Sequence, residues 1–250
     1  MAGISQKTLE KIMSSQEIFI SHPEGKMHDI PTITESCKCN AFCKRMGACS
    51  AAVCSKCYAQ NSLAFEKAAA ARYDRNTQLL SGGIIPEHLL PRVYSDIARF
   101  ESHGDWVNEY SAMNEIAIAN FNSKTHFTVW TKRVDILRKL CKAGVLQPKN
   151  LHVMLSSPFV DKSLPHSLKL WFADRGWTVS FFTVMSLDDL RKNYTDDELR
   201  ERGHEIITCG GRDCRSCMKC YGDHPHEDVV ELLKQDVYKA TKLGMRYKES

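Results

Sequence analysis

The cysteines are the residues of this chain best suited to bind a metal or to react, and they are concentrated in two short segments. Eleven cysteines occur among 250 residues: six lie between Cys37 and Cys57, and four lie between Cys209 and Cys220. Intracellular clusters this tight are typical of metal ligands, whereas a disulfide framework belongs to secreted proteins. The remaining cysteine, Cys141, lies in the leucine-flanked segment DILRKLCKAG and is expected to be a core thiol.

The second cysteine segment has the spacing of a complete metal site. Cys209, Cys214, Cys217 and Cys220 follow one another with gaps of four, two and two residues. Four thiolates this close can hold either a zinc ion or an iron–sulfur cluster. A compact run of two-residue gaps resembles the C-x2-C-x2-C runs of ferredoxins, whereas structural zinc usually uses two CxxC pairs separated by a longer loop. The spacing therefore favours an iron–sulfur cluster, with zinc as the alternative.

The first cysteine segment leaves its ligand set open. Its tightest pair is Cys54 and Cys57, and either Cys43 or Cys49 is expected to be a third ligand. A cluster held by three cysteines leaves one iron open to a substrate or cofactor, as the open position of a catalytic zinc site does. The alternative is a closed four-cysteine structural site, or one shared with the second segment.

Composition narrows the class of protein that carries these cysteines. The chain is 43% hydrophobic and has a formal net charge of +4, which neither requires nor excludes a nucleic-acid partner. Its apolar stretches are far shorter than the roughly 18 residues of a membrane span, so no transmembrane helix is expected. The first 15 residues contain no long apolar region of a secretory signal. The prediction is a cytoplasmic protein that does not contact a membrane.

Predicted helices and strands alternate along the chain, and they must position the cysteines. Helix-forming patterns are expected at residues 5–14, 60–80, 108–121, 132–144, 167–176, 195–203 and 226–244. Strands are expected at residues 93–102, 125–131, 150–157, 177–184 and 204–208, the last running into Cys209. Strand–helix alternation over some 130 residues predicts an α/β fold with a parallel sheet. Right-handed βαβ units suit a partial (open) parallel β/α barrel of about five to six strands.

These patterns predict a single domain over residues 1–250. It would comprise an N-terminal lead (1–36), the first cysteine block (37–58), an α/β body (59–208), the second cysteine block (209–221) and a C-terminal helix (222–250). The cysteine blocks then form a cysteine-rich N-terminal loop and a cysteine-rich C-terminal tail on the sheet.

Functional groups of parallel sheets lie at the carboxyl ends of the strands, and polar motifs occur there. Asp105 follows the first predicted strand and is expected to be functional, while Lys132 follows the second and could bind a carboxylate or phosphate. Arg99 and Glu101 alternate on the first of these strands, so a barrel interior would make them functional. The alternatives are surface charge for Lys132 and an ion pair on an exposed edge strand for Arg99 and Glu101.

Several short motifs together resemble a known family. In order they are CNAFC, CSKCYA, RNTQLL, IIPEHLLP, RFESHGDWVNE, TVWTKRVDIL, VMLSSP and ITCGGRDCRSCMKCY, and they span roughly residues 30–221. Their order and content resemble the gene-product-88-like family of phage and prophage proteins. That family is similar in outline to radical S-adenosylmethionine (radical SAM) enzymes.

The resemblance implies two [4Fe-4S] clusters and a set of ligands for each. One cluster would be held by Cys43, Cys54 and Cys57 with an open iron, and the second by Cys209, Cys214, Cys217 and Cys220. Cys37, Cys39 and Cys49 then become extra. The glycine-rich segment that holds the methionine end of S-adenosylmethionine would be replaced by His103-Gly104-Asp105, and Tyr58 would join the cofactor site.

The chain also departs from the radical SAM signature, which is C-x3-C-x2-C with an aromatic residue before the last cysteine. Ten residues separate Cys43 from Cys54, and Lys56 precedes Cys57 while Tyr58 follows it. The sequence therefore supports two alternative hypotheses about function. The first is a radical-SAM-like enzyme that uses a small-molecule cofactor and an electron donor. The second is a non-enzymatic module that binds nucleic acid or a host protein, with two closed structural zinc or iron–sulfur centres.

Overall fold

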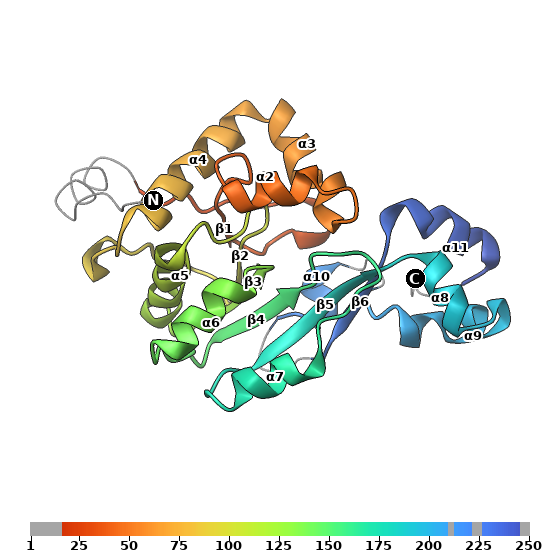
Figure 1. Cartoon of the computed structure of the whole chain (residues 1–250). Coiled ribbons are helices and arrows are strands. Elements are labelled where there is room, and N and C mark those ends of the chain that lie inside the picture. Colours follow the sequence, from red (N-terminus) through yellow and green to blue (C-terminus); the bar gives the residue numbers. More distant parts are fainter. Residues whose placement is uncertain (1–16, 210–212, 222–226, 246–250) are drawn as a thin grey trace.

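A single parallel sheet organises the chain, which is described here by a computed structural model. The structure describes residues 17–209, 213–221 and 227–245. Among them, six parallel strands follow one another in the order β1 to β6 (Figure 1). The strands are β1 (Thr32–Ile33), β2 (Ile97–Phe100), β3 (His126–Thr131), β4 (Leu151–Ser156), β5 (Val179–Met185) and β6 (Val229–Leu232). This open, all-parallel sheet confirms the predicted α/β fold class.

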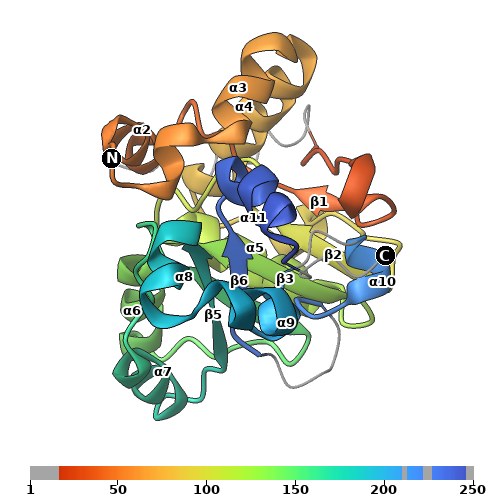
Figure 2. The same ribbon diagram turned by 90° about the vertical axis from the view of Figure 1, so that its right-hand side faces the viewer.

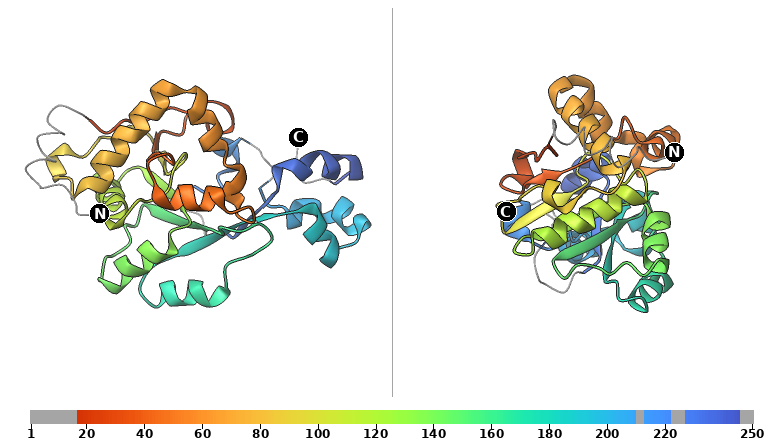
Figure 3. Two further views of the ribbon diagram at one scale, coloured as in Figure 1. Left: turned by 45° about the horizontal axis from the view of Figure 1, so that its top comes forward. Right: turned by 90° about the vertical axis from the view of Figure 1, so that its left-hand side faces the viewer.

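The α-helices lie in three groups around the sheet, and Figures 1 and 3 show the grouping from different sides. The first group is α2 (Ala41–Ala48), α3 (Tyr58–Phe65) and α4 (Lys67–Gly82); the second is α5 (Glu109–Phe121), α6 (Val134–Lys142) and α7 (His166–Ala173). The third is α8 (Leu187–Asn193), α9 (Asp196–Ile206) and α11 (Val237–Leu243), and the short α10 (Cys214–Cys217) lies apart from these groups. Four 3-10 turns are η1 (Gly25–Met27), η2 (Val53–Lys56), η3 (Glu87–Leu89) and η4 (Lys234–Asp236).

The two faces of the sheet differ in chemistry. The register aligns Ala98 with Phe127 and Val129 with Val153, so one face is apolar. It packs with buried residues of α5, α6 and α7 in the largest hydrophobic cluster. On the other face the register aligns Arg99 with Thr128 and places Trp130 beside Met154. We call this second surface the polar face of the sheet.

The C-terminal part differs from the sequence prediction at two places. Residues 204–208 do not form a strand, because α9 continues through Ile206 and its apolar side packs in the cluster of α8 and α11. The last strand is Val229–Leu232, which we expected to be helical; it pairs with β5 and completes the sheet. A short apolar run of this kind fits either a buried helix or a buried strand, and only its partner decides between them.

Other boundaries also differ in detail. Strand β1 lies within the segment expected to be an irregular lead, and the helix expected at 60–80 is interrupted at Glu66, between α3 and α4. The capping box of Thr195 and Glu198 is present as predicted. The helix expected at residues 5–14 lies outside the described residues. No helix in the described part of the chain is long and apolar enough to cross a membrane.

Candidate functional site

The first cysteine set is assembled by short elements at the carboxyl ends of the central strands. Cys43 lies in α2, Cys54 in η2, and Cys57 is the N-cap of α3. The Asn40 side chain caps α2 by accepting hydrogen bonds from the amides of Phe42 and Cys43, at 2.9 and 3.4 Å. The thiols interact electrostatically, since Cys54 contributes to raising the pKa of Cys43 after burial, the larger cause. The three predicted ligands of this set therefore lie in one region of the fold.

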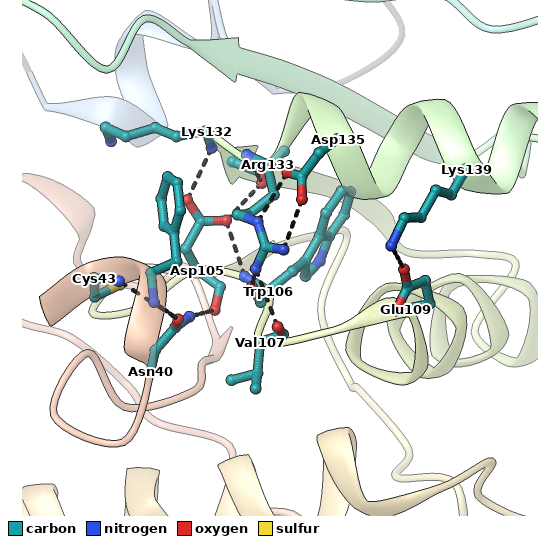
Figure 4. A network of polar contacts seen from close by, with 12 residues as sticks. Asn40, Cys43, Asp105, Trp106, Val107, Glu109, Lys132, Arg133, Asp135 and Lys139 are labelled. Carbon is teal, nitrogen blue, oxygen red and sulfur yellow. Dashed lines mark hydrogen bonds and ion pairs between the residues drawn. The ribbon is translucent and has the colours of Figure 1, made fainter. Parts of the chain in front are cut away.

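Asp105 connects this set to the sheet and is buried, with 3% of its surface exposed. Its carboxylate accepts hydrogen bonds from the Thr131 hydroxyl at 2.6 Å, the Lys132 amide at 2.8 Å and its neighbouring Trp106 amide at 2.9 Å (Figure 4). Burial raises the pKa of Asp105, and Lys132 opposes this shift. The Asn40 Nδ2 group donates to the Asp105 carbonyl at 2.5 Å. Asp105 therefore holds the end of β3 against the start of α2.

The side chains of Lys132 and Arg133 differ in what they contact. The Lys132 ammonium lowers the pKa of Cys54, although burial, the largest cause, raises it overall. In Figure 4 the Lys132 side chain extends away from the carboxylate that its own amide contacts. Arg133 instead donates to the carbonyls of Trp106 and Val107 and pairs with Asp135. Lys132 is thus the cation that faces the first cysteine set, while Arg133 fixes the loop before α5.

The residues expected to bind a cofactor lie beside the same set. The Tyr58 hydroxyl donates to the Ser102 carbonyl, and the Tyr58 ring meets the His103 ring edge-on with centroids 5.6 Å apart. Gly104 has a structural reason for being glycine, because an added Cβ would lie 2.4 Å from the Glu35 carbonyl oxygen. Tyr58, His103, Gly104 and Asp105 are therefore brought together, and the missing Cβ of Gly104 allows the loop to approach Glu35.

The second cysteine set lies toward the opposite ends of the strands. The Cys209 amide donates to Val230 at 2.9 Å, and Cys214 and Cys217 lie in α10. The Cys220 carbonyl accepts a hydrogen bond of 2.7 Å from the hydroxyl of Thr128, on the polar face. Burial, together with the other three thiols of the set, raises the pKa of Cys220 to about 12, although Arg99 opposes this shift. Cys209 does not end a strand as predicted but makes an isolated parallel bridge with Glu231.

The loop of the second set is anchored beside β2, and a separate ion pair links η1 to β6. Arg215 pairs with Asp96, just before β2, through two hydrogen bonds of 2.7 and 2.9 Å. On the other side Lys26, in η1, pairs with Glu231 of β6 at 3.6 Å. Figure 2 shows α10 beside β1 and β2. The second set thus contacts the start of β2 through Arg215 and β6 through Cys209.

Arg99 is a partly buried cation beside the second set. Strand β2 lies between β1 and β3, so Arg99 and Glu101 are not on an exposed edge strand, and that alternative is wrong. The Arg99 guanidinium stacks on Trp130 at 4.7 Å and donates to the Met27 sulfur at 3.0 Å. Its Nε is buried without a hydrogen-bond partner in the described residues. The Arg99 charge acts to lower the pKa of Cys214 and of Cys220, against burial, which raises both.

Glu101 belongs to a buried group of carboxyls on the other side of the Gly104 loop. Glu35, Glu101 and Glu115 are each at most 3% exposed. Glu101 and Glu115 lie within hydrogen-bonding reach of each other, a bond that requires one of them to be protonated. Glu101 Oε2 and Glu115 Oε1 are buried and accept no hydrogen bond from any residue that the structure describes. Burial raises the pKa of Glu101 to about 8 and that of Glu115 well above its usual range.

This carboxyl group predicts a pH-dependent stability. The pKa of Glu101 is higher in the folded protein than in the unfolded chain. Between about pH 4.5 and pH 8, Glu101 is therefore protonated in the folded state and ionised in the unfolded state. The free energy of unfolding should therefore fall as the pH rises through this window, by up to about 5 kcal/mol from this cause. Urea unfolding of Glu101→Gln should show a flatter pH profile. The exposed control Glu201→Gln should keep the wild-type profile, and an unchanged slope in Glu101→Gln would contradict the assignment.

Both cysteine sets have the donor chemistry of a metal centre. Each is a group of neighbouring thiols with a cation facing it, Lys132 at the first and Arg99 at the second. A buried guanidinium with an unpartnered nitrogen fits an anionic thiolate centre, because it offers positive charge where the metal-bound thiolates would carry negative charge. Among the residues that the structure describes, no three His, Cys, Asp or Glu side chains are already placed at coordinating positions.

One cysteine that the sequence set aside lies beside the first set. Cys37 is buried and hydrogen-bonded to Cys57, whereas Cys39 is exposed and its sulfur contacts Asp74 at 3.2 Å. Nothing in the spacing distinguished Cys37, because five residues of the chain separate it from Cys43. Cys141 is buried in the main core, as predicted.

No family model matches the chain, and neither a curated protein nor a solved structure matches it.

Proposed function

We propose that this chain is a phage- or prophage-type iron–sulfur protein related in mechanism to radical SAM enzymes. Cys43, Cys54 and Cys57 would hold one [4Fe-4S] cluster, and the four cysteines from Cys209 to Cys220 would hold a second. When bound, a cluster with an iron not ligated by the protein supplies a coordination position for S-adenosylmethionine and an electron for its reductive cleavage. The host cytoplasm would supply the electron donor.

One observation supports this function above the others: two thiol sets flank the polar face, and each has its own cation. Lys132 faces the first set and Arg99 the second. Positive charge beside thiols favours their deprotonated, metal-binding form. The two sets are also held by separate contacts, the first through Asp105 and the second through Thr128 and Asp96. Such an arrangement suits two metal centres with different functions.

The residues around the first set would have defined parts in this function. Tyr58, His103 and the Asp105 loop lie where a cofactor bound at the open position would contact the protein. The Lys132 ammonium has no ion pair within the described residues, so it is available for a carboxylate of a bound molecule. Burial of Asp105 and its three hydrogen bonds would keep this loop in place while the cofactor binds. The substrate is not identified by these residues.

A second candidate function is a non-enzymatic module that binds nucleic acid or a host protein, with zinc or iron–sulfur centres as structural supports. The observation that favours it is Cys37, which offers the first set a fourth thiol. Four thiolates around one metal form a closed structural site.

Metal and sulfide analysis of the full chain, purified without oxygen, distinguishes the two candidate functions. About eight iron and eight sulfide per chain, with broad visible absorption, are expected for two [4Fe-4S] clusters. S-adenosylmethionine should then perturb the electron paramagnetic resonance spectrum of the reduced protein. Stoichiometric zinc without sulfide would contradict the iron–sulfur proposal and leave the second candidate.

A further inference from the structure

Cys37 lies in the segment between β1 and α2 and is almost completely buried, with 2% of its surface exposed. Its amide donates to the His103 carbonyl at 3.2 Å, which fixes the backbone beside the loop of Asp105. It packs in one cluster with Cys43, and Cys57 lies against the same cluster. Cys37 is therefore buried beside two thiols of the first set.

The partner of Cys37 is Cys57. The Cys57 thiol lies within hydrogen-bonding reach of the Cys37 thiol, and both side chains pack in the same cluster. Cys43 lies close enough to raise the pKa of Cys37 as well. Cys37 is therefore a neighbour of two of the three thiols that the proposed first centre uses.

The other two unassigned cysteines of the segment lack this environment. Cys39 is exposed, and its sulfur contacts the Asp74 carboxylate. Cys49 follows the end of α2, where its amide caps the helix by donating to the Met46 carbonyl at 3.2 Å. Both are close in sequence to the ligands, so they are matched controls for any effect of removing a thiol from this segment.

We infer that Cys37 is the fourth thiol ligand of the first cysteine set and occupies, in the resting protein, the position that an open site would leave to a cofactor. The inference rests on the proposed metal centre at this set and specifies its resting state. A small molecule would bind the metal by replacing the Cys37 thiolate, which leaves with its electron pair and takes up a proton. No electron transfer is needed for this exchange.

The surroundings of Cys37 permit such an exchange. A cavity of about 410 Å³ opens beside it, lined by Cys37, Lys38, Lys44, Gly47, Ala48 and Gln60. Its volume is within the range of small-ligand sites. A molecule in this cavity meets Cys37 directly, whereas Cys43, Cys54 and Cys57 do not line it. Cys37 is thus the thiol of the set that a ligand entering here would replace.

The test compares four single variants of the full chain, purified without oxygen: Cys37→Ser, Cys39→Ser, Cys49→Ser and Cys43→Ser. The rate at which a chelator such as EDTA removes the metal is measured, whichever metal is bound. Cys43→Ser should lose the first centre during purification. Cys37→Ser should retain metal but release it at least about tenfold faster than wild type, since three thiolates remain. Cys39→Ser and Cys49→Ser should match wild type.

A second readout applies to an iron–sulfur centre. Mild oxidation should convert the first cluster of Cys37→Ser to a three-iron form, detected by electron paramagnetic resonance, while the wild-type cluster resists. Cys37→Ala, with circular dichroism, controls for misfolding of the serine variant at this buried position. If Cys37→Ser and Cys37→Ala behave like Cys39→Ser while Cys43→Ser loses metal, the inference is wrong and the open site stands. If Cys43→Ser also keeps all its metal, the proposed first centre fails together with the inference.

Discussion

Replacement of Cys220 by serine should remove about half of the metal bound by the chain, because the second centre would lose one of its four ligands. Cys220 interacts electrostatically with all three other thiols of its set, and its carbonyl anchors the loop to Thr128 of β3. Metal binding by four thiolates contributes directly to folding, so the variant should also unfold at lower urea concentration. The measurements are metal per chain and a urea titration of the anaerobic protein.

Cys141→Ser is the matched control for this experiment. Cys141 is also buried, but it lies in α6 within the main hydrophobic cluster. Its variant should keep the full metal content and change only the stability of the core, by roughly 1 to 2 kcal/mol. A Cys220→Ser protein with wild-type metal content would show that the C-terminal cysteines do not form a centre.

Replacement of Asp105 by alanine should destabilise the fold by about 4 kcal/mol, because three buried donors lose their acceptor together. These donors are the Thr131 hydroxyl and the amides of Trp106 and Lys132. The end of β3 would separate from the loop that contacts α2, so the first centre should also release its metal faster. Urea unfolding and chelator release measure the two effects.

Asp135→Ala provides the comparison, since Asp135 belongs to the same neighbourhood but pairs with Arg133 at the surface, with 58% of its side chain exposed. Exposed ion pairs contribute less than about 1 kcal/mol. If Asp105→Ala costs no more than Asp135→Ala, then the carboxylate of Asp105 does not hold the loop, and the link between β3 and the first cysteine set is wrong.

Arg99 and Glu101 show why neighbouring positions on one strand take different roles. Both project to the polar face of β2, yet Arg99 faces the thiols of the second set, whereas Glu101 shares hydrogen bonds with Glu115 and the Glu35 amide. We predicted both as catalytic residues of a barrel interior. Their burial agrees with an interior position, while their contacts assign Arg99 to charge compensation and Glu101 to the carboxyl group.

Local patterns in the sequence determined those helices and strands that have a capping motif or a characteristic run of residues. The capping box at Thr195 fixed the start of α9, and the β-branched run at 126–131 fixed β3. The alternation of such elements determined a parallel sheet, because parallel strands need a helix to cross between them. The spacing of Cys214, Cys217 and Cys220 likewise brought those thiols together within a few residues of chain.

Only the tertiary structure decided the features that depend on distant partners. Strands β1 and β6 exist because β2 and β5 offer unpaired backbone to them, and a window of sequence does not contain that partner. Cys37 meets Cys57 twenty residues away because β1 and α3 are both held against the loop after β2. Burial of Arg99 required the α10 loop to cover its strand from more than a hundred residues along the chain. Spacing limits which residues can meet, and long-range packing selects which of them do.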